Sequence, residues 1–528
     1  MSEKNLVLIL VAHQGYIRCT DSQKDFGAEN DILFSAISQT YLPLINLFHK
    51  LKKEKVPFKI SLVLSPALCA LLDDSVIKKQ YVEWLDRRIA LGEHEIERLK
   101  EKPKLQKNAQ FCLTQAQQNK IDFVEKYRQN LLAQFSMFAK KGYIELLATT
   151  GTYAFLPHYA DMPEVLNAQI ETGSYSHKYF FDSAAEGLWL PFMGYAPGIE
   201  TVIRSYGLNY TILDTQALLF SETQPADGIF SPVRAANSLA IFARDRDTPD
   251  DITNIQTGFA ANKVYKNQQK DIAFELPPEE LSDFLKTDFA RVNSLYRYWS
   301  KVEDESGVCE PYDYEKACVQ AQKDAQSFLE QKNKKLDEAA SLLNKKVCLV
   351  CVLEASILGQ DWAEGIVWLE DVLRENSGSR FASCGELIEN QFKFQKIVPY
   401  PSAASGTGYG EDLLDNTNSS MIRYTRKMCD RMVDLSDRFP LDTGLKIRLL
   451  NLAARELLLA QSSEWPKMLH DGKLPEYVEK RFKEFVIAFT TVFDSLGSNT
   501  VSTEWLTRLE KEHAIFPWMN YRIFSKKK

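Results

Sequence analysis

Short apolar runs alternate with longer amphipathic segments over most of the first 400 residues, and this alternation constrains the fold more than any other feature. The first and last of these runs, Leu6–Val11 and Val347–Leu353, are continuously apolar, as in strands that are buried on both faces. Strands of this kind, separated by covering helices, form a mainly parallel sheet that is either open or closed into a barrel. The predicted strands are Leu6–Val11, Phe58–Leu64, Tyr143–Ala148, Leu188–Trp189, Tyr210–Leu213 and Val347–Leu353.

Between these strands, apolar residues recur at the spacing of a helix face. The predicted helices are Asp31–Lys52, Val76–Lys100, Ile121–Lys140, Pro163–Phe181, Ile199–Tyr206, Tyr314–Asn344 and Asp361–Arg374. The stretch 214–307 is less regular, and we expect it to be an insertion that leaves the sheet.

The pattern changes after about residue 400, where helical segments follow one another and no strand is predicted. A segment rich in Pro, Gly and Ser, residues 399–410, lies at this change and is typical of a domain junction. We therefore expect an α/β domain over residues 1–398 and an all-helical domain over residues 399–528. The helices predicted in the second domain are Met421–Leu435, Leu445–Gln461 and Tyr477–Leu496.

Composition excludes several classes of protein. A chain of 528 residues with 45% hydrophobic residues can bury a large core without help from disulfides or metals. The net charge is −7, from 64 Lys and Arg against 71 Asp and Glu, so the basic surplus of a nucleic-acid-binding protein is absent. No apolar run approaches the roughly 18 to 20 residues of a membrane span. Nine scattered cysteines, an odd number, are typical of reduced thiols in the cytoplasm.

The residues that most often hold metals are not arranged to do so. Cys348 and Cys351 form a C-x-x-C inside a predicted strand, where positions three apart face opposite sides. The histidines lack metal-ligand spacing. We predict two separately buried thiols, no metal site and no cofactor.

One stretch carries a chemical signature: Gly187-Leu-Trp-Leu-Pro-Phe-Met-Gly-Tyr-Ala-Pro-Gly-Ile-Glu200. It is a predicted strand that runs into a rigid turn, and active sites in parallel barrels are built where strands end. The stretch resembles glycoside hydrolase family 57, in particular its α-glucan branching enzymes and amylase-like members. Further segments resemble the family in the same order along the chain: 11–16, 36–44, 154–157, 163–170, 242–245, 359–365, 459–465 and 514–517.

The resemblance implies an incomplete (β/α)7 barrel with an insertion and a C-terminal helical domain that closes over a cleft. It also implies an enzyme that retains anomeric configuration. A retaining glycosidase needs two carboxyl groups about 5 to 5.5 Å apart, one as nucleophile and one as acid/base.

At the positions that the family uses for catalysis, this chain differs. The family nucleophile is a Glu after Trp-Leu-Pro, and here that position is Phe192, whose ring cannot attack an anomeric carbon. The family acid/base is an Asp, and here it is Glu354, which can still donate a proton. A family Glu two residues further on is Ser356. Loss of a nucleophile costs about 10⁶-fold in a serine protease, so the resemblance implies an impaired enzyme.

The implied substrate-binding positions are changed in part. A family His becomes Tyr153, a Gly becomes Ala261, a junction Trp becomes Ala404 and an Asp becomes Glu464, whereas the family residues at His13, Arg244 and Trp465 are retained and Trp362 lies in a matching segment. Each also has a purely structural interpretation. His13 can be a hydrogen-bonded core residue, Arg244 can form a surface ion pair with Asp245, and the tryptophans can be core side chains.

An inverting mechanism would need a second carboxylate about 6.5 to 9.5 Å from Glu354 to act as base. Asp361 and Glu364, at the start of the next predicted helix, are the residues that could approach, although the resemblance gives Glu364 another role. Phe192 beside Glu354 would make the pocket less polar and raise the carboxyl pKa.

Three functions remain open. The protein can be a non-catalytic relative that binds α-glucan or a maltooligosaccharide, or that works alongside glycogen enzymes in the cytoplasm. It can be an active retaining α-glucan transglycosylase or hydrolase with rebuilt catalytic residues. It can also be a structural or assembly protein that keeps only the fold.

Overall fold

Seven parallel strands form the centre of the molecule. The computed structural model describes residues 3–19, 29–285, 292–303, 305–375, 378–498 and 502–526. The strands lie in the order β10-β1-β2-β3-β4-β5-β7, and each neighbouring pair is parallel. They are β1 (Lys4–Ala12), β2 (Ile60–Leu64), β3 (Ile144–Thr149), β4 (Gly187–Trp189), β5 (Tyr210–Leu213), β7 (Ala240–Ala243) and β10 (Val347–Glu354).

The two ends of this sheet meet only locally. A single bridge joins Arg244, just after β7, to Val350 of β10. Two short strands extend the sheet: β6 (Val233–Arg234) runs antiparallel to β7, and β11 (Arg380–Phe381) runs parallel to β1. The sheet is thus an incomplete (β/α)7 barrel, and the expected fold class is confirmed.

Alternate residues of the strands line the inside of the barrel, as the two-residue repeat of a strand requires. Val7, Ile9 and Val11 of β1 belong to one buried cluster with Val350 and Val352 of β10, which we call the inner core. The residues between them on β1 and β10 pack in a second cluster, against the covering helices. Strand β10 continues this alternation to its last residue, so its carboxyl end delivers a side chain towards the barrel mouth.

The C-x-x-C motif obeys the same alternation. Cys348 belongs to the inner core and Cys351 to the outer cluster, and both are buried free thiols. The prediction that the two sulfur atoms face opposite sides of a strand is confirmed.

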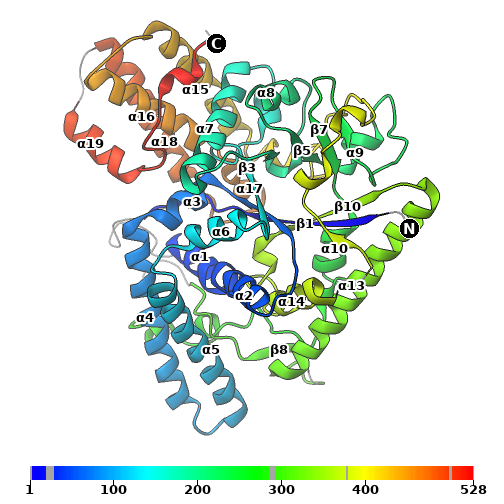
Figure 1. The fold of residues 1–528 in the computed structure, drawn as a ribbon. Helices are drawn as coiled ribbons and strands as arrows, with labels where there is room; N and C mark the ends of the chain where they lie inside the picture. The colour runs from blue at the N-terminus through cyan, green and yellow to red at the C-terminus, as the bar shows by residue number, and fades with distance from the viewer. Residues whose placement is uncertain are drawn as a thin grey trace.

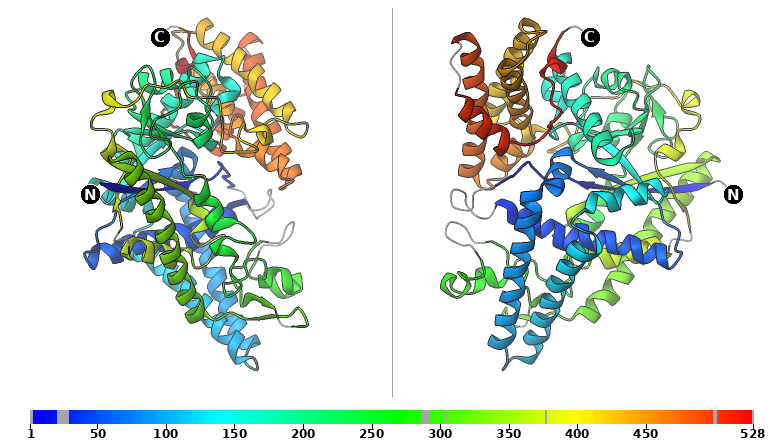
Figure 2. Two further views of the ribbon diagram at one scale, coloured as in Figure 1. Left: turned by 90° about the vertical axis from the view of Figure 1, so that its right-hand side faces the viewer. Right: turned by 60° about the vertical axis from the view of Figure 1, so that its left-hand side comes forward.

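Helices cover the outside of the sheet, and a long hairpin of α4 and α5 extends away from it (Figures 1 and 2). A π-helical turn, residues 37–41, joins α1 to α2. The covering helices are α1 (Glu29–Ala36), α2 (Leu42–Lys53), α3 (Pro66–Asp73), α4 (Ser75–Arg98), α5 (Pro103–Ile121), α6 (Leu131–Lys140), α7 (Pro163–Phe181), α8 (Ile199–Ser205), α13 (Tyr314–Leu343) and α14 (Gly365–Glu375).

Two helix predictions need correction. The segment 121–140 is not one helix: a π turn follows α5, Arg128 and Gln129 have left-handed backbone, and Asn130 caps the start of α6. The helix predicted from Asp361 begins instead at Gly365, because residues 355–362 form a turn closed by a bridge between Leu358 and Trp362.

The stretch 214–307 is not an excursion throughout. Strands β6 and β7 lie within it, and β7 pairs with β5 as a full member of the barrel. The part that leaves the barrel begins after Arg244; of this part, residues 286–291 and 304 lie outside the described residues. It contains α10 (Asp247–Thr253), α11 (Ile272–Glu275), α12 (Pro278–Leu281) and β8 (Trp299–Glu303), which pairs with β9 (Cys309–Pro311).

The chain after residue 410 is helical and lies at the end of the molecule away from the α4–α5 hairpin (Figure 2). It docks on the loop after β3, where the Ser462 hydroxyl donates to the Thr152 carbonyl at 2.7 Å and the Phe155 amide donates to the Ser463 hydroxyl at 2.6 Å. Among the described helices, none is both long and apolar enough for a membrane crossing. The helices are α15 (Ser419–Arg438), α16 (Leu445–Ala460), α17 (Glu464–His470), α18 (Pro475–Ser498) and α19 (Thr503–Glu512).

Candidate active site

The turn after β4 places Phe192 at the mouth of the barrel. Phe192 has a φ of 54°, in the left-handed region that is uncommon for a bulky residue. Its carbonyl accepts a hydrogen bond from the amide of Ala404 at 2.6 Å, which ties the turn to the segment 399–410. The phenyl ring meets Tyr153 edge-on, with 5.8 Å between ring centroids, and packs near Phe155 and Leu413. The position predicted for a nucleophile therefore makes apolar contacts only.

Glu354 is the last residue of β10 and lies opposite Val11 in the register of β1. Solvent reaches its side chain, yet protein atoms surround it closely. Burial, and secondly the charge of Asp361, raise the pKa of Glu354 to about 7. Burial, followed by the charge of Glu354, raises the pKa of Tyr153 well above its ordinary value, which places this phenol within electrostatic reach of the carboxyl.

The two acids considered as partners of Glu354 lie in different places. Asp361 is exposed and accepts a hydrogen bond from the Ser356 hydroxyl at 2.6 Å. Glu364 is buried and accepts hydrogen bonds from the Tyr312 hydroxyl at 2.6 Å and the Lys266 amide at 3.2 Å. Of the two, only Asp361 acts on Glu354 electrostatically.

His13, in the loop after β1, is held from both sides. Its Nδ1 lies 3.0 Å from the Ser65 hydroxyl, and its Nε2 lies 3.2 Å from Oε2 of Glu464. Ser65 also accepts the Leu68 amide as the cap of α3. A carboxylate only accepts hydrogen bonds, so the contact with Glu464 is one in which Nε2–H of His13 donates. A Cβ on Gly15 would overlap Oε1 of Glu464, so a larger residue there would displace the Glu464 side chain.

Arg244 and Asp245 do not pair with each other. Arg244 binds Asp214, at the end of β5, with 2.7 Å from both Nε and Nη2 to Oδ2. Asp245 is buried and accepts a hydrogen bond from the buried ammonium group of Lys332 at 2.6 Å. The interpretation of an Arg244–Asp245 surface pair is thus wrong.

The remaining predicted positions are dispersed. Trp362 and Trp465 are 1% and 0% exposed, so neither presents a ring face to a ligand. Ala404 contacts the site through the hydrogen bond that its backbone amide donates to the carbonyl of Phe192. Ala261 lies in the turn Phe259–Ala261, and no hydrogen bond of the described residues joins it to Phe192, Tyr153 or Glu354.

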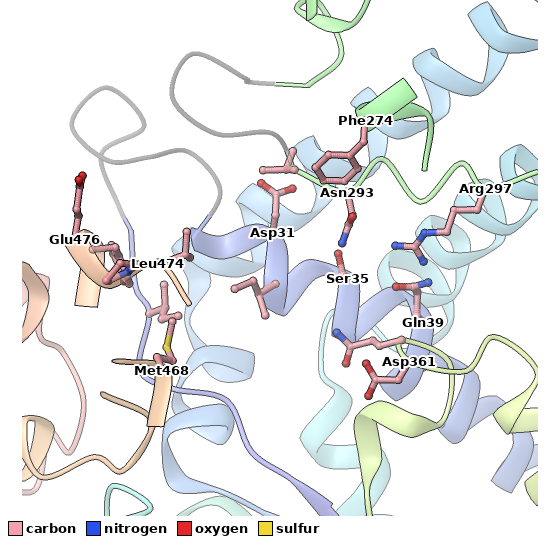
Figure 3. A pocket seen from close by; sticks show the side chains of 16 residues that line it. Asp31, Ser35, Gln39, Phe274, Asn293, Arg297, Asp361, Met468, Leu474 and Glu476 are labelled. Atoms are coloured by element: carbon pink, nitrogen blue, oxygen red, sulfur yellow. The ribbon is translucent and has the colours of Figure 1, made fainter. Parts of the chain in front are cut away.

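A cavity of about 570 Å³ lies beside the barrel mouth and was not predicted from the sequence (Figure 3). It is in the size range of small-molecule sites. Segments far apart in the chain supply its walls: the loop after β1, α1 with the turn after it, the part beyond Arg244, the turn after β10, and the region of α17 and α18. The lining residues include Gln39, Phe274, Arg297, Gln360, Asp361 and Leu474. Asp361 lines this cavity and is also the acid that acts on Glu354, whereas Glu354, Phe192 and Tyr153 are not among the lining residues.

The similarity of the chain to known proteins indicates its family. The family model described as Glycosyl hydrolase family 57 matches residues 7–355, and the model described as 1,4-alpha-glucan branching enzyme, C-terminal, matches residues 424–524. A 1,4-alpha-glucan branching enzyme of Thermococcus kodakarensis is 23% identical over 510 residues, which are 90% of this chain and 71% of that protein. A probable 1,4-alpha-glucan branching enzyme of Mycobacterium tuberculosis is 22% identical, covering 85% of this chain and 84% of the relative.

Solved structures agree on the fold. The alpha-amylase AmyC from Thermotoga maritima superposes with a TM-score of 0.91 at 26% identity, covering all of both chains. A branching enzyme of the same family from Pyrococcus horikoshii superposes with a TM-score of 0.88 at 22% identity, covering 99% of this chain and 97% of that chain.

Proposed function

The chain belongs to glycosyl hydrolase family 57 and is similar to its branching enzymes, and from that premise we propose that it binds an α-glucan or a maltooligosaccharide while lacking most catalytic power. The observation that carries the proposal is Phe192. At the position where the resemblance places the attacking carboxylate, the chain has a ring in contact with Tyr153, Phe155 and Leu413. Such a residue can neither attack an anomeric carbon nor stabilise a positive charge on it.

The cavity supports the binding half of the proposal. Sugar hydroxyls need hydrogen-bond donors and acceptors, and Gln39, Gln360 and Asp361 supply both kinds along one wall. Phe274, 49% exposed, offers a ring to the apolar face of a pyranose. A glutamic acid with a pKa of about 7 keeps a proton in much of the population at neutral pH, so Glu354 can donate a hydrogen bond to a sugar oxygen.

A second function, an active enzyme with rebuilt residues, is favoured by one observation. The pKa of Glu354 is raised by its environment, to which Asp361 contributes. Two neighbouring acids of which one has a raised pKa are the pattern of an acid and base pair. In that mechanism Glu354 would protonate the leaving oxygen and Asp361 would activate water. An open cavity lined by Asp361 argues against the third function, a protein that keeps only the fold.

The compartment is part of the proposal. All nine cysteines are free thiols, which supports a reducing environment such as the cytoplasm, where glycogen is made and degraded. Association with glycogen metabolism rests on the branching-enzyme relatives.

Two measurements on the full chain test these functions. Calorimetric titration with maltoheptaose should show binding, and long incubation with amylose should yield neither new α-1,6 branches nor new reducing ends. Phe274→Ala should weaken the binding. Phe392→Ala is the matched control, because Phe392 is 71% exposed and lies outside the cavity.

Each outcome decides between the functions. Absence of binding to both maltoheptaose and glycogen would refute the binding proposal and favour the third function. New branches or new reducing ends would refute the loss of catalysis, and reducing ends that disappear in Asp361→Asn would support the second function.

A further inference from the structure

Three aromatic side chains form a patch on the outer surface of the barrel, where α7 meets the C-terminal segment. Tyr175 and Tyr179, one helical turn apart on α7, are 51% and 53% exposed. The ring of Trp518 lies 5.2 Å from that of Tyr175 and 4.3 Å from that of Tyr179, tilted by 37° and 39°. We call Tyr175, Tyr179 and Trp518 the aromatic patch. Figure 1 shows α7 next to the red C-terminal segment.

The patch is held in place from below. Trp518 rests on Phe516, with 5.9 Å between centroids, and on Phe180, with 6.2 Å. Phe516 is 1% exposed, so Trp518 is anchored in the core of the C-terminal helices. The rings therefore keep their relative orientation without a ligand, and binding would lose little side-chain entropy.

The patch lies apart from the site at the barrel mouth. Helix α7 follows β3 and runs back along the barrel, so its last two turns, which carry Tyr175 and Tyr179, lie towards the end opposite Glu354. No member of the patch lines the 570 Å³ cavity.

The chemistry of the patch is amphipathic and nearly neutral. A contiguous group of aromatic rings at the surface, here two exposed tyrosines and a half-buried tryptophan, is a typical mark of a binding surface. Each ring also has a polar edge, and within the described residues no hydrogen bond uses the two phenol groups or the indole N–H. Nucleic-acid stacking surfaces line a basic groove, whereas between residues 171 and 182 the charges are Glu171, Lys178 and Asp182. Rings with polar edges and little charge fit a neutral sugar, whose C–H face stacks and whose hydroxyls bond at the rim.

We propose that the aromatic patch is a second α-glucan-binding site, which holds a few successive glucose units of a chain at a distance from Glu354. This second site rests on the proposed function, because it is that function which identifies α-glucan as the ligand of the protein. The patch would anchor a large, branched glucan, whereas the cavity takes a short segment.

Affinity electrophoresis of the full chain in gels with and without glycogen tests this proposal. Tyr175→Ala combined with Tyr179→Ala should weaken glycogen binding about tenfold, the loss common for truncated central aromatic contacts. Both positions are exposed on a helix, where alanine is well tolerated. Tyr424→Ala is the matched control for Tyr179→Ala, because Tyr424 is 50% exposed on α15 and has no aromatic neighbour among the described rings.

The two sites are distinguished by their ligands. Patch variants should leave maltoheptaose titration at the cavity unchanged, and Phe274→Ala should affect that titration. If the double variant binds glycogen as tightly as the wild type does, the proposal for the aromatic patch is refuted, even if maltoheptaose still binds at the cavity. Equal loss of glycogen binding in Tyr424→Ala also refutes it. Loss confined to the patch variants, including Trp518→Ala, supports it.

Discussion

The imidazole of His13 lies flat on the phenol ring of Tyr153, with 3.8 Å between centroids and 10° between the planes. Tyr153 in turn meets Phe192 edge-on. His13, Tyr153 and Phe192 follow β1, β3 and β4, so a row of three rings crosses the barrel mouth. Tyr153 and Phe192 are both substitutions relative to the family resemblance. Their contact indicates that they form one apolar unit, in which changing either residue alone leaves the other without its partner.

Restoring the family carboxylates should not restore the chemistry. Phe192→Glu with Glu354→Asp puts acids at both positions, but Tyr153 still occupies the space beside them and Ser356 remains. We expect at most a trace of branching on amylose, measured as new α-1,6 linkages. Phe192→Glu alone should also lower the free energy of unfolding by about 1 to 3 kcal/mol, because it buries part of a carboxyl among apolar rings. Strong branching by the double variant would contradict this account.

Glu354 should make stability depend on pH. Its pKa of about 7 lies above the usual value of about 4.3. Below pH 4 the group is neutral in folded and unfolded chains and has no effect. Between pH 4 and pH 7, Glu354 is ionised in the unfolded chain while it keeps its proton in the folded protein. The free energy of unfolding therefore falls as the pH rises, and this loss is complete above pH 7. Glu354→Gln should therefore raise the free energy of unfolding at pH 8, by on the order of 1 kcal/mol because solvent reaches the group, and leave it unchanged at pH 4.

Urea denaturation at pH 4, 6 and 8 measures this effect. Asp361→Asn is the companion variant: it removes the neighbouring charge but not the burial, so the pKa of Glu354 in the folded protein should come down, and the fall in stability should end at a lower pH and become smaller. An equal effect of Glu354→Gln at all three pH values would show that packing, and not ionisation, is responsible.

The contact between His13 and Glu464 should couple the barrel to the C-terminal helices. Glu464→Ala and His13→Ala should each destabilise the protein, and the double variant should lose less than their sum, with a coupling of about 1 kcal/mol. The exposed pair Glu479–Lys483, 3.3 Å apart, is the control and should couple by less than about 0.5 kcal/mol. Thermal and urea unfolding provide the values, and equal coupling in both pairs would contradict the prediction.

Lys332 should be a main determinant of stability. Its ammonium group is fully buried and bonds Asp245 and Asp251, both at 2.6 Å. Lys332→Ala should cost about 3 to 5 kcal/mol, because it leaves Asp245 buried without its main partner. Lys335 also bonds Asp245, at 2.9 Å, but is 32% exposed. Lys335→Ala should therefore cost much less. Similar urea midpoints for the two variants would rule out this ranking.

The sequence predicts best where one local pattern decides the structure. Strand β5 is found at its exact limits and β10 to within one residue, because each is a continuous apolar run bounded by polar residues. The break between α5 and α6 is missed because Arg128 and Gln129 adopt left-handed backbone without a glycine to signal it. Strand β7 has four residues in an irregular stretch, so no local pattern marks it, and only the family resemblance of 242–245 indicates it before its pairing with β5 is seen.

In the candidate site, too, the sequence predicts what a local pattern decides and misses what depends on contacts between distant segments. The positions of Phe192 and Glu354 follow from strand ends and from the family resemblance. The Asp214 partner of Arg244 lies 30 residues earlier, and only the order of the strands brings the two together. The cavity joins segments as distant as Gln39 and Leu474, and no local pattern encodes such an assembly.

The turn that carries Phe192 is secured by main-chain bonds alone: its carbonyl accepts the Ala404 amide, and the Met193 amide donates to the Leu190 carbonyl. Neither bond depends on which side chain stands at position 192. An ancestor could therefore exchange a reactive group for an inert one here and keep the backbone of the turn, while side chains that face position 192, Tyr153 among them, change with it. The descendants of such an event would inherit a receptor for the old substrate, already shaped and free to acquire another use.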